Sequence, residues 1–153
     1  MSTTSERKVS VSRVIPAAPA VIFAILDDPS MHPVIDGSGT VRSSRQPGRH
    51  VRLGDTFSMD MRRGVPYRMR STVVEYTQDR VIAWAHFGGH RWRYLLEPTE
   101  GGTLVTEEFD WSTAKVPWVI ERLGFPRKHP ASMRTTLDRL ADVVAGKAVG
   151  ADG

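Results

Sequence analysis

The chain has 153 residues, 40% of them hydrophobic and 25% charged, a composition typical of one globular domain. Cysteine is absent, which excludes disulfides, thiolate catalysis and cysteine-bound metal centres. The net charge of +4 comes from 21 basic and 17 acidic residues that are spread along the chain without a block of like charges, so no nucleic-acid partner is expected.

No stretch approaches the roughly 20 consecutive apolar residues that cross a bilayer, so we expect no integral membrane association. The first eight residues lack the apolar core of a secretory signal, which favours a cytoplasmic location. Residues 1–7 and 147–153 are polar or small and are predicted to be flexible ends. One ligand-binding domain is predicted at residues 8–146.

The chain is predicted to open with a strand followed by two short helices. Residues 9–15 alternate between apolar and polar side chains, as in a strand that is buried on one side. Pro19 then begins an apolar run to Leu26 that predicts a helix of two to three turns. A second helical turn at residues 31–35 is predicted to stop at Gly37.

From residue 39 to residue 111 the hydrophobic period changes to two, which is typical of strands. Turn signals at residues 46–48, 63–64, 78–80, 88–89 and 100–102 divide this region into six strands. Each strand has one apolar and one charged side, which indicates an antiparallel sheet with one wet face. The wet face carries Arg68, Arg70, Arg91 and Arg93 with Asp60, Glu97, Glu108 and Asp110, so we expect cross-strand ion pairs there.

The chain is predicted to end in a long helix. Met133, Leu137, Leu140 and Val144 recur at spacings of four, three and four, which places them on one stripe that must face the sheet. The helix is predicted to end near Ala145. Before it, residues 112–123 carry helical spacing that includes Trp118, with an interruption at residues 124–126.

This order of elements gives an α+β fold and excludes lipocalin-type barrels and cystatin-like folds, whose helices lie elsewhere. Four segments carry a family resemblance: residues 14–23 (VIPAAPAVIF), 74–76 (VEY) with 82–84 (IAW), 97–98 (EP) and 101–107 (GGTLVTE). Through them the chain resembles the polyketide cyclase/dehydrase and lipid-transport family of the START-like (SRPBCC, Bet v 1-like) superfamily. The resemblance implies a helix-grip fold, in which a seven-stranded curved antiparallel sheet surrounds the long C-terminal helix and leaves a cavity between them.

The apolar side of the predicted sheet is rich in large and adaptable side chains. Aromatic rings suit planar ligands, and methionine adapts to irregular shapes. We therefore interpret this side as the lining of a hydrophobic cavity, although the same residues could simply fill a core. The predicted ligand-binding residues are Phe57, Met59, Met69, Tyr67, Trp84, Trp92, Tyr94, Phe109, Trp118 and Met133.

Three residues are candidate catalytic groups. Glu107 shares strand parity with Phe109, so it is predicted to point inward, where burial would raise its pKa as general acid-base catalysis requires. The alternative is a position near the wet end of the strand, paired with an arginine. Tyr67 and Tyr94 could orient a ligand oxygen, or they could only hydrogen-bond the backbone.

No motif for a cofactor is present, and no metal site is expected. His86 and His90 flank a glycine pair, but a metal would need a third ligand and none is evident nearby. Two histidines beside a hairpin turn are expected to be exposed.

The leading hypothesis is a binding or carrier protein for a hydrophobic lipid, polyketide or aromatic molecule. The alternative is a cyclase, aromatase or dehydratase that acts on such a ligand, with Glu107 or a tyrosine moving a proton. A third possibility is an interaction protein that uses the sheet as a docking surface. The sequence leaves the choice between monomer and homodimer open.

Overall fold

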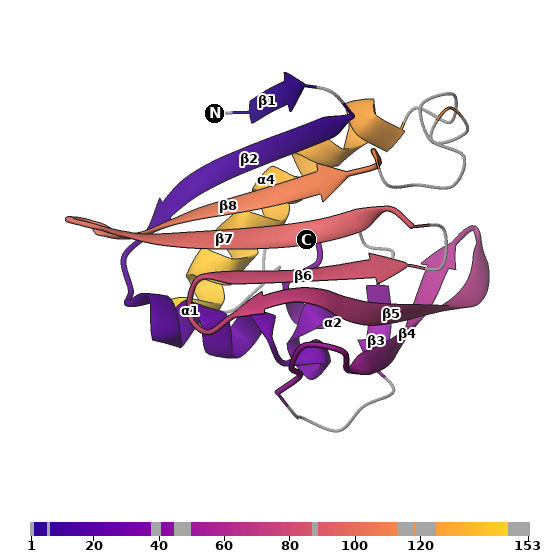
Figure 1. Cartoon of the computed structure of the whole chain (residues 1–153), viewed down its shortest axis with the longest axis horizontal. Helices are drawn as coiled ribbons and strands as arrows, with labels where there is room; N and C mark the ends of the chain where they lie inside the picture. The colour runs from indigo at the N-terminus through magenta and orange to yellow at the C-terminus, as the bar shows by residue number, and fades with distance from the viewer. Residues whose placement is uncertain are drawn as a thin grey trace.

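An eight-stranded antiparallel sheet forms one layer of the molecule, and the C-terminal helix crosses one of its faces (Figure 1). The computed structural model describes residues 2–5, 7–37, 41–44, 50–86, 89–112, 118 and 125–146. The strands are β1 (Ser2–Ser5), β2 (Lys8–Ile15), β3 (Val41–Ser44), β4 (Thr56–Arg63), β5 (Val65–Thr77), β6 (Val81–His86), β7 (Arg91–Thr99) and β8 (Gly102–Asp110). Their order across the sheet is β1-β2-β8-β7-β6-β5-β4-β3.

Strand β1 is the eighth strand, where the sequence predicts seven. It lies within residues 1–7, so the expectation of a flexible end is wrong for Ser2–Ser5, which pairs antiparallel with β2 from Lys8 to Val11. The strand contains only serine and threonine. It therefore has no apolar alternation from which a strand could be predicted.

Three short helical elements connect β2 to β3. They are α1 (Pro19–Leu26), the 3-10 helix η1 (Pro29–Met31) and α2 (His32–Ile35). Helix α1 has the predicted bounds and begins at Pro19. Proline is tolerated there because an N–H at the first helical position would have no intrahelical acceptor. The predicted second turn is thus divided between η1, whose first turn is capped by the Asp28 carboxylate, and α2.

Helix α4 (Phe125–Val144) is the predicted C-terminal helix and ends, as predicted, just before Gly146. Gly146 has a φ of +73°, a conformation that glycine adopts without strain. Met133, Leu137 and Leu140 are buried on its predicted stripe. The predicted helix at residues 112–123 and the tail at 147–153 fall outside the described residues, except that Ser112 is described as a turn residue and Trp118 as helical.

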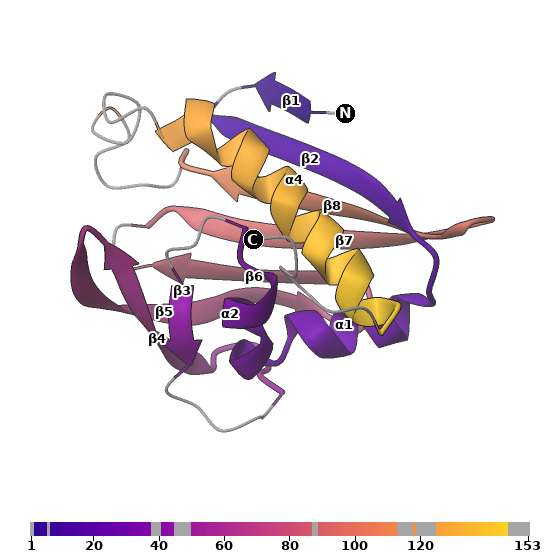
Figure 2. The ribbon, with the colours of Figure 1, turned by 180° about the vertical axis from the view of Figure 1, so that it is seen from behind.

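Figure 2 shows α4 lying diagonally across one face of the sheet, with α1 and α2 beside it. The helix packs on β2 and β8 and also touches α1 and α2. The connection after α2 approaches it closely, since the Gly37 N–H donates a hydrogen bond of 2.9 Å to Thr136 Oγ1. The sheet side that α4 contacts is called the inner face below.

The predicted parity of the strands is confirmed most clearly along β8, where buried and half-buried residues alternate. Val105, Glu107 and Phe109 are buried, whereas Thr106 and Glu108 are only half-buried on the outer face. In the part of the chain that the structure describes, no helix combines the length and apolarity that a membrane span requires.

Candidate functional site

Aromatic side chains from three adjacent strands form a continuous strip across the inner face. The register places Trp84 of β6 opposite Trp92 of β7, and Trp92 opposite Phe109 of β8. The ring centroids of Trp92 and Phe109 are 4.7 Å apart, and those of Trp84 and Tyr94 are 5.7 Å apart. All four residues belong to the predicted ligand-binding set.

Most of the predicted ligand-binding residues lie on this face. Phe57, Met59, Trp84, Tyr94, Phe109 and Met133 are buried, and Tyr67, Met69 and Trp92 are half-buried. Trp118 is different, because 58% of its surface is exposed, so its predicted inward position is wrong. Helical spacing groups Trp118 with other apolar residues, but spacing alone does not say against what a helix packs.

Glu107 lies on the inner face, as predicted, and not beside an arginine. It is 3% exposed and faces Tyr94 across β7 and β8, where the Tyr94 hydroxyl donates a hydrogen bond to its carboxylate. Burial raises the pKa of Glu107 well above its ordinary value, and the charge of Asp36 adds to this increase, although the Tyr94 hydrogen bond opposes it. A raised carboxyl pKa of this kind is a condition for general acid-base catalysis.

His86 and His90 are half-buried on the inner face, so the expectation that they are exposed is wrong. Their ring centroids are 4.8 Å apart, and His90 packs edge-on against Phe109 at 5.6 Å. His86 Nδ1 shares a hydrogen bond of 2.8 Å with Ser71 Oγ. Strand parity could have placed both histidines, because His86 follows Trp84 by two residues and His90 precedes Trp92 by two.

The two imidazoles are held neutral. Burial, with a smaller contribution from the charge of His90, lowers the pKa of His86 to about 3. Burial also lowers the pKa of His90. Within the described part of the chain, no three histidine, aspartate or glutamate side chains gather as a metal site would require.

His32 on α2 is a further inner-face residue that sequence reasoning did not single out. Its Nε2–H donates a hydrogen bond of 2.9 Å to the Leu26 carbonyl, and its ring stacks on Trp84 with centroids 4.7 Å apart. Burial lowers its pKa, although the hydrogen bond to Leu26 opposes this. No periodicity in the short helical turn around His32 would have predicted this contact.

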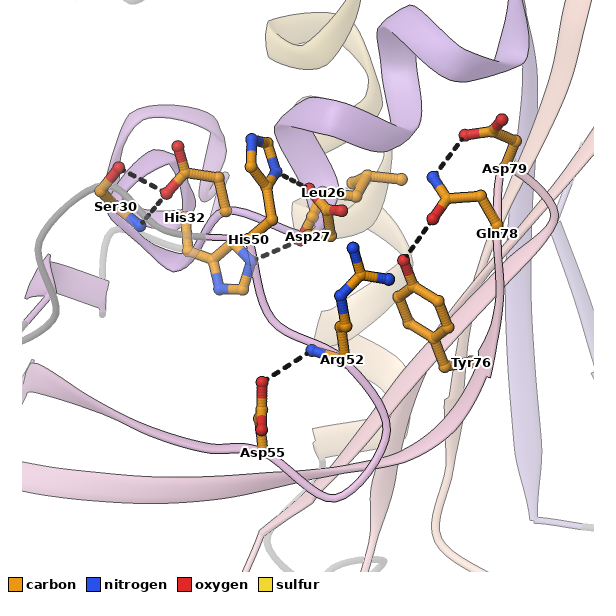
Figure 3. A network of polar contacts seen from close by, with 11 residues as sticks. Leu26, Asp27, Ser30, His32, His50, Arg52, Asp55, Tyr76, Gln78 and Asp79 are labelled. Atoms are coloured by element: carbon orange, nitrogen blue, oxygen red, sulfur yellow. Dashed lines mark hydrogen bonds and ion pairs between the residues drawn. The ribbon is translucent and has the colours of Figure 1, made fainter.

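A second polar feature lies outside the inner face, between α1 and the β5–β6 turn (Figure 3). It is a pocket of about 320 Å³ lined by Ala20, Ala24, Asp27, His50, Arg52, Tyr76, Gln78 and Asp79. On one wall the Tyr76 hydroxyl donates a hydrogen bond of 2.6 Å to Gln78, whose amide donates one of 3.0 Å to Asp79. None of these residues was singled out as a site from the sequence.

Asp27, which is buried, and His50, which is exposed, form a hydrogen-bonded pair in this pocket. Asp27 is 4% exposed, and its carboxylate accepts a hydrogen bond of 2.5 Å from His50 Nδ1. Burial raises the pKa of Asp27, although the His50 hydrogen bond opposes this. The same hydrogen bond raises the pKa of His50. The pair joins the end of α1 to the segment that enters β4.

The outer face carries cross-strand ion pairs, of which Arg93–Glu108 joins two of the residues predicted to pair. Arg93 lies 2.8 Å from Glu75 and 3.5 Å from Glu108, and Lys8 lies 3.8 Å from Asp110. These contacts account for part of the positive charge without a nucleic acid or a membrane.

Comparison with known proteins finds a matching family profile and related sequences. The sequence profile described as polyketide cyclase/dehydrase and lipid transport matches residues 6–145. The uncharacterized protein Rv0088 of Mycobacterium tuberculosis is 37% identical over 146 residues, which are 90% of this chain and 64% of that protein. The chain thus spans less than two thirds of the length of this relative.

Solved structures share the fold at low sequence identity. A protein from Arthrobacter aurescens superimposes with a TM-score of 0.75 at 13% identity and covers 99% of this chain and 95% of its own. An AHSA1-like protein from Aeromonas hydrophila gives a TM-score of 0.62 at 17% identity, with coverage of 91% and 94% respectively. These likenesses establish the fold alone.

Proposed function

The chain belongs to the polyketide cyclase/dehydrase and lipid transport family, and from this premise we propose that it binds and carries a hydrophobic small molecule. The ligand is a lipid, a polyketide or an aromatic compound that occupies a cavity on the inner face. The proposed contacts are the aromatic strip and the methionines of β4 and β5. The observation that carries the proposal is the distribution of burial along this face.

Burial is uneven across the inner face. Met69 and Trp92 are half-buried, whereas their register partners Met59, Trp84 and Phe109 are buried. Large apolar side chains that remain partly accessible beside a buried aromatic strip form the kind of surface that small ligands contact. The half-buried Met69 and Trp92 are the side chains through which we propose that a ligand reaches the strip.

The position of α4 supports the same reading. The helix packs mainly on β2 and β8 (Figure 2), whereas the methionines and Tyr67 belong to β4 and β5 on the other half of the sheet. A ligand on β4 to β7 would complete the apolar surface that the helix does not contact. The proposed site therefore lies beside the helix and not beneath it.

A neutral fluorescent probe tests the proposal. N-phenyl-1-naphthylamine should bind the purified chain with an increase in fluorescence and should quench the emission of Trp84 and Trp92. Native mass spectrometry of the gently purified protein should detect the mass of a co-purified hydrophobic molecule. Absence of both probe binding and a co-purified ligand would contradict the proposed function.

Two neighbouring residues of β5 provide matched variants. Met69→Asp places a charge on the inner face and should lower probe affinity at least about tenfold, because a buried unpaired charge is strongly unfavourable. Arg70→Asp changes the adjacent, exposed residue on the outer face and should leave probe affinity unchanged. Equal losses in the two variants would place the probe elsewhere.

A second candidate function is a cyclase, aromatase or dehydratase that uses the same site. The observation that favours it is the buried Tyr94–Glu107 pair, whose carboxyl group has a raised pKa. In this reading Glu107 or a tyrosine moves a proton on a folded ligand chain. Glu107→Gln and Tyr94→Phe should then abolish turnover of a bound polyketide while preserving its binding. Retention of turnover in both variants would eliminate these roles.

The third candidate function, docking of a protein on the sheet, has less support. The outer face carries the Arg93 and Lys8 ion pairs. A docking surface of this kind would instead present a contiguous apolar patch.

A further inference from the structure

The charged residues of β5 to β8 are separated between the two faces of the sheet. Every lysine, arginine and aspartate of these four strands shares parity with the outer face, including Arg68, Arg70, Arg91 and Arg93. The cations with inner-face parity lie away from these strands: Arg63 ends β4, and Arg13 of β2 pairs with Asp138 of α4. On the inner face of β5 to β8, the one ionisable carboxyl group is Glu107. No lysine or arginine of β5 to β8 is therefore placed to pair with an anionic ligand on the aromatic strip.

Four ionisable groups that face inward on or next to β6 to β8 are shifted toward their neutral forms. Burial is the largest cause in each case: it raises the pKa of Glu107 and of Tyr94 and lowers the pKa of His86 and of His90. At neutral pH the face thus presents a carboxyl group, a phenol and two uncharged imidazoles. These are hydrogen-bonding groups without charge.

Two polar atoms on this face are buried without a hydrogen-bond partner. They are Glu107 Oε1 and His90 Nδ1. Trp92 and Phe109, which lie opposite each other, are located between these two atoms. His90 precedes Trp92 by two residues, and Glu107 precedes Phe109 by two residues on the antiparallel strand β8. Four residues along a strand correspond to roughly 13 Å, so the two atoms mark the two ends of an apolar strip. Unsatisfied buried polar atoms of this kind are uncommon and indicate a missing partner.

From this arrangement we propose that the inner-face site selects an uncharged ligand, namely an apolar molecule whose polar groups are hydroxyl or carbonyl oxygens. Carboxylate- and phosphate-bearing amphiphiles, such as free fatty acids, are disfavoured because β6 to β8, which carry the aromatic strip, place no lysine or arginine on this face. The oxygens of the ligand would satisfy Glu107 Oε1 at one end of the strip and His90 Nδ1 at the other. This inference rests on the proposed function and specifies the chemical class of its ligand.

Matched pairs of competitors test the inference in the full-length chain loaded with N-phenyl-1-naphthylamine. The pairs are 2-naphthol with 2-naphthoate and 1-dodecanol with dodecanoate, at about pH 7.5, where both acids are ionised. We expect the dissociation constant of each neutral member, measured by displacement of the probe, to be at least about 30-fold lower than that of its carboxylate, because burial of an unpaired charge is strongly unfavourable. Equal or tighter binding of the carboxylates would overturn the inference.

A gain-of-function variant gives a second, independent measurement. Met69→Lys introduces a cation on the half-buried part of the inner face and should raise dodecanoate affinity while lowering that of 1-dodecanol. Thr72→Lys adds the same charge on the outer face of the same strand and should leave the preference unchanged. If Met69→Lys does not fold, Met61→Lys on β4 serves the same purpose. An unchanged preference in a folded inner-face lysine variant would contradict the inference.

Removal of the polar atom at one end completes the test. Glu107→Leu should weaken 2-naphthol more than naphthalene, because only the hydroxyl loses a partner. Equal weakening of the two would assign Glu107 a structural role and overturn the proposed contact.

The proposed function and the neutral-ligand inference fail in different ways. If neither probe nor competitor binds, the proposed function fails, whereas tight binding of carboxylates contradicts only the neutral-ligand inference.

Discussion

Tyr94 and Glu107 face each other across the β7–β8 pair, and the tyrosine hydroxyl is hydrogen-bonded to a carboxyl group that is almost fully buried. Among the described residues the carboxyl group pairs with no cation, and its Oε1 atom has no hydrogen-bond partner. The pair is therefore stable in its uncharged state. This relationship links the stability of the fold to the protonation of a residue at the candidate site.

The first prediction concerns stability and the charge of Glu107. Because the folded-state pKa is raised, its stabilising contribution is complete below the unfolded-state pKa of about 4.3 and is lost as pH rises through the folded-state pKa. The free energy of unfolding should therefore fall with pH in the native chain, by up to about 1.4 kcal/mol per pH unit, relative to Glu107→Gln. Urea unfolding between pH 5 and pH 8 measures the difference. Glu97→Gln, at an exposed position of β7, is the control, and parallel curves for native chain and Glu107→Gln would contradict the prediction.

The second prediction concerns acid sensitivity and His86. Its pKa is lowered to about 3 in the folded state, so its contribution is present above the unfolded-state pKa of about 6.5 and is lost as pH falls. Between pH 6.5 and pH 5 the native chain should lose about 2 kcal/mol of stability relative to His86→Asn. His32 and His90 remain in the variant, so the free energy of unfolding of His86→Asn should also fall at acid pH, but less steeply. NMR titration should show the His86 ring still neutral at pH 5, and protonation of that ring near pH 6.5 would disprove the assignment.

Strand alternation was the most informative part of the sequence. It predicted β4 to β8, the two faces and the inward position of Glu107, because one wet face forces polar and apolar residues to alternate. It also predicts the position of His86 and His90, because parity determines the face of a residue even beside a hairpin turn. The alternation continues to the last residue of a strand, so the histidines follow the tryptophans onto the inner face.

Other features left no signal in the local pattern. Strand β1 is held by backbone pairing of serine and threonine, which have no apolar period. Asp27 and His50 are separated by 23 residues along the chain, so their contact depends on how the segment before β4 returns to α1. Trp118 shows the reverse failure, in which helical spacing predicts burial for a residue that is exposed.

The third prediction concerns the Asp27–His50 pair. Because the hydrogen bond to Asp27 raises the pKa of His50, His50 should titrate above the ordinary histidine value of about 6.5. Asp27→Asn keeps the shape and removes the negative charge, so the His50 titration should return toward the ordinary value. Two-dimensional NMR of the imidazole protons measures both proteins. Identical titration in the two would show that the pair does not form in solution.

The last prediction concerns the contact that holds α2 against α4. A Cβ on Gly37 would collide with the Ser132 carbonyl oxygen and lie 2.7 Å from the Thr136 nitrogen, and these backbone atoms cannot move without displacing the helix. Gly37→Ala should therefore destabilise the chain by about 2–3 kcal/mol, in the range of overpacked cores. Gly101→Ala is the matched control, since its Cβ would meet only a Val14 methyl group at 3.5 Å. Because α2 also carries His32, which stacks on Trp84, Gly37→Ala should weaken probe binding as well as stability, whereas a loss of stability with unchanged binding would separate α2 from the ligand site.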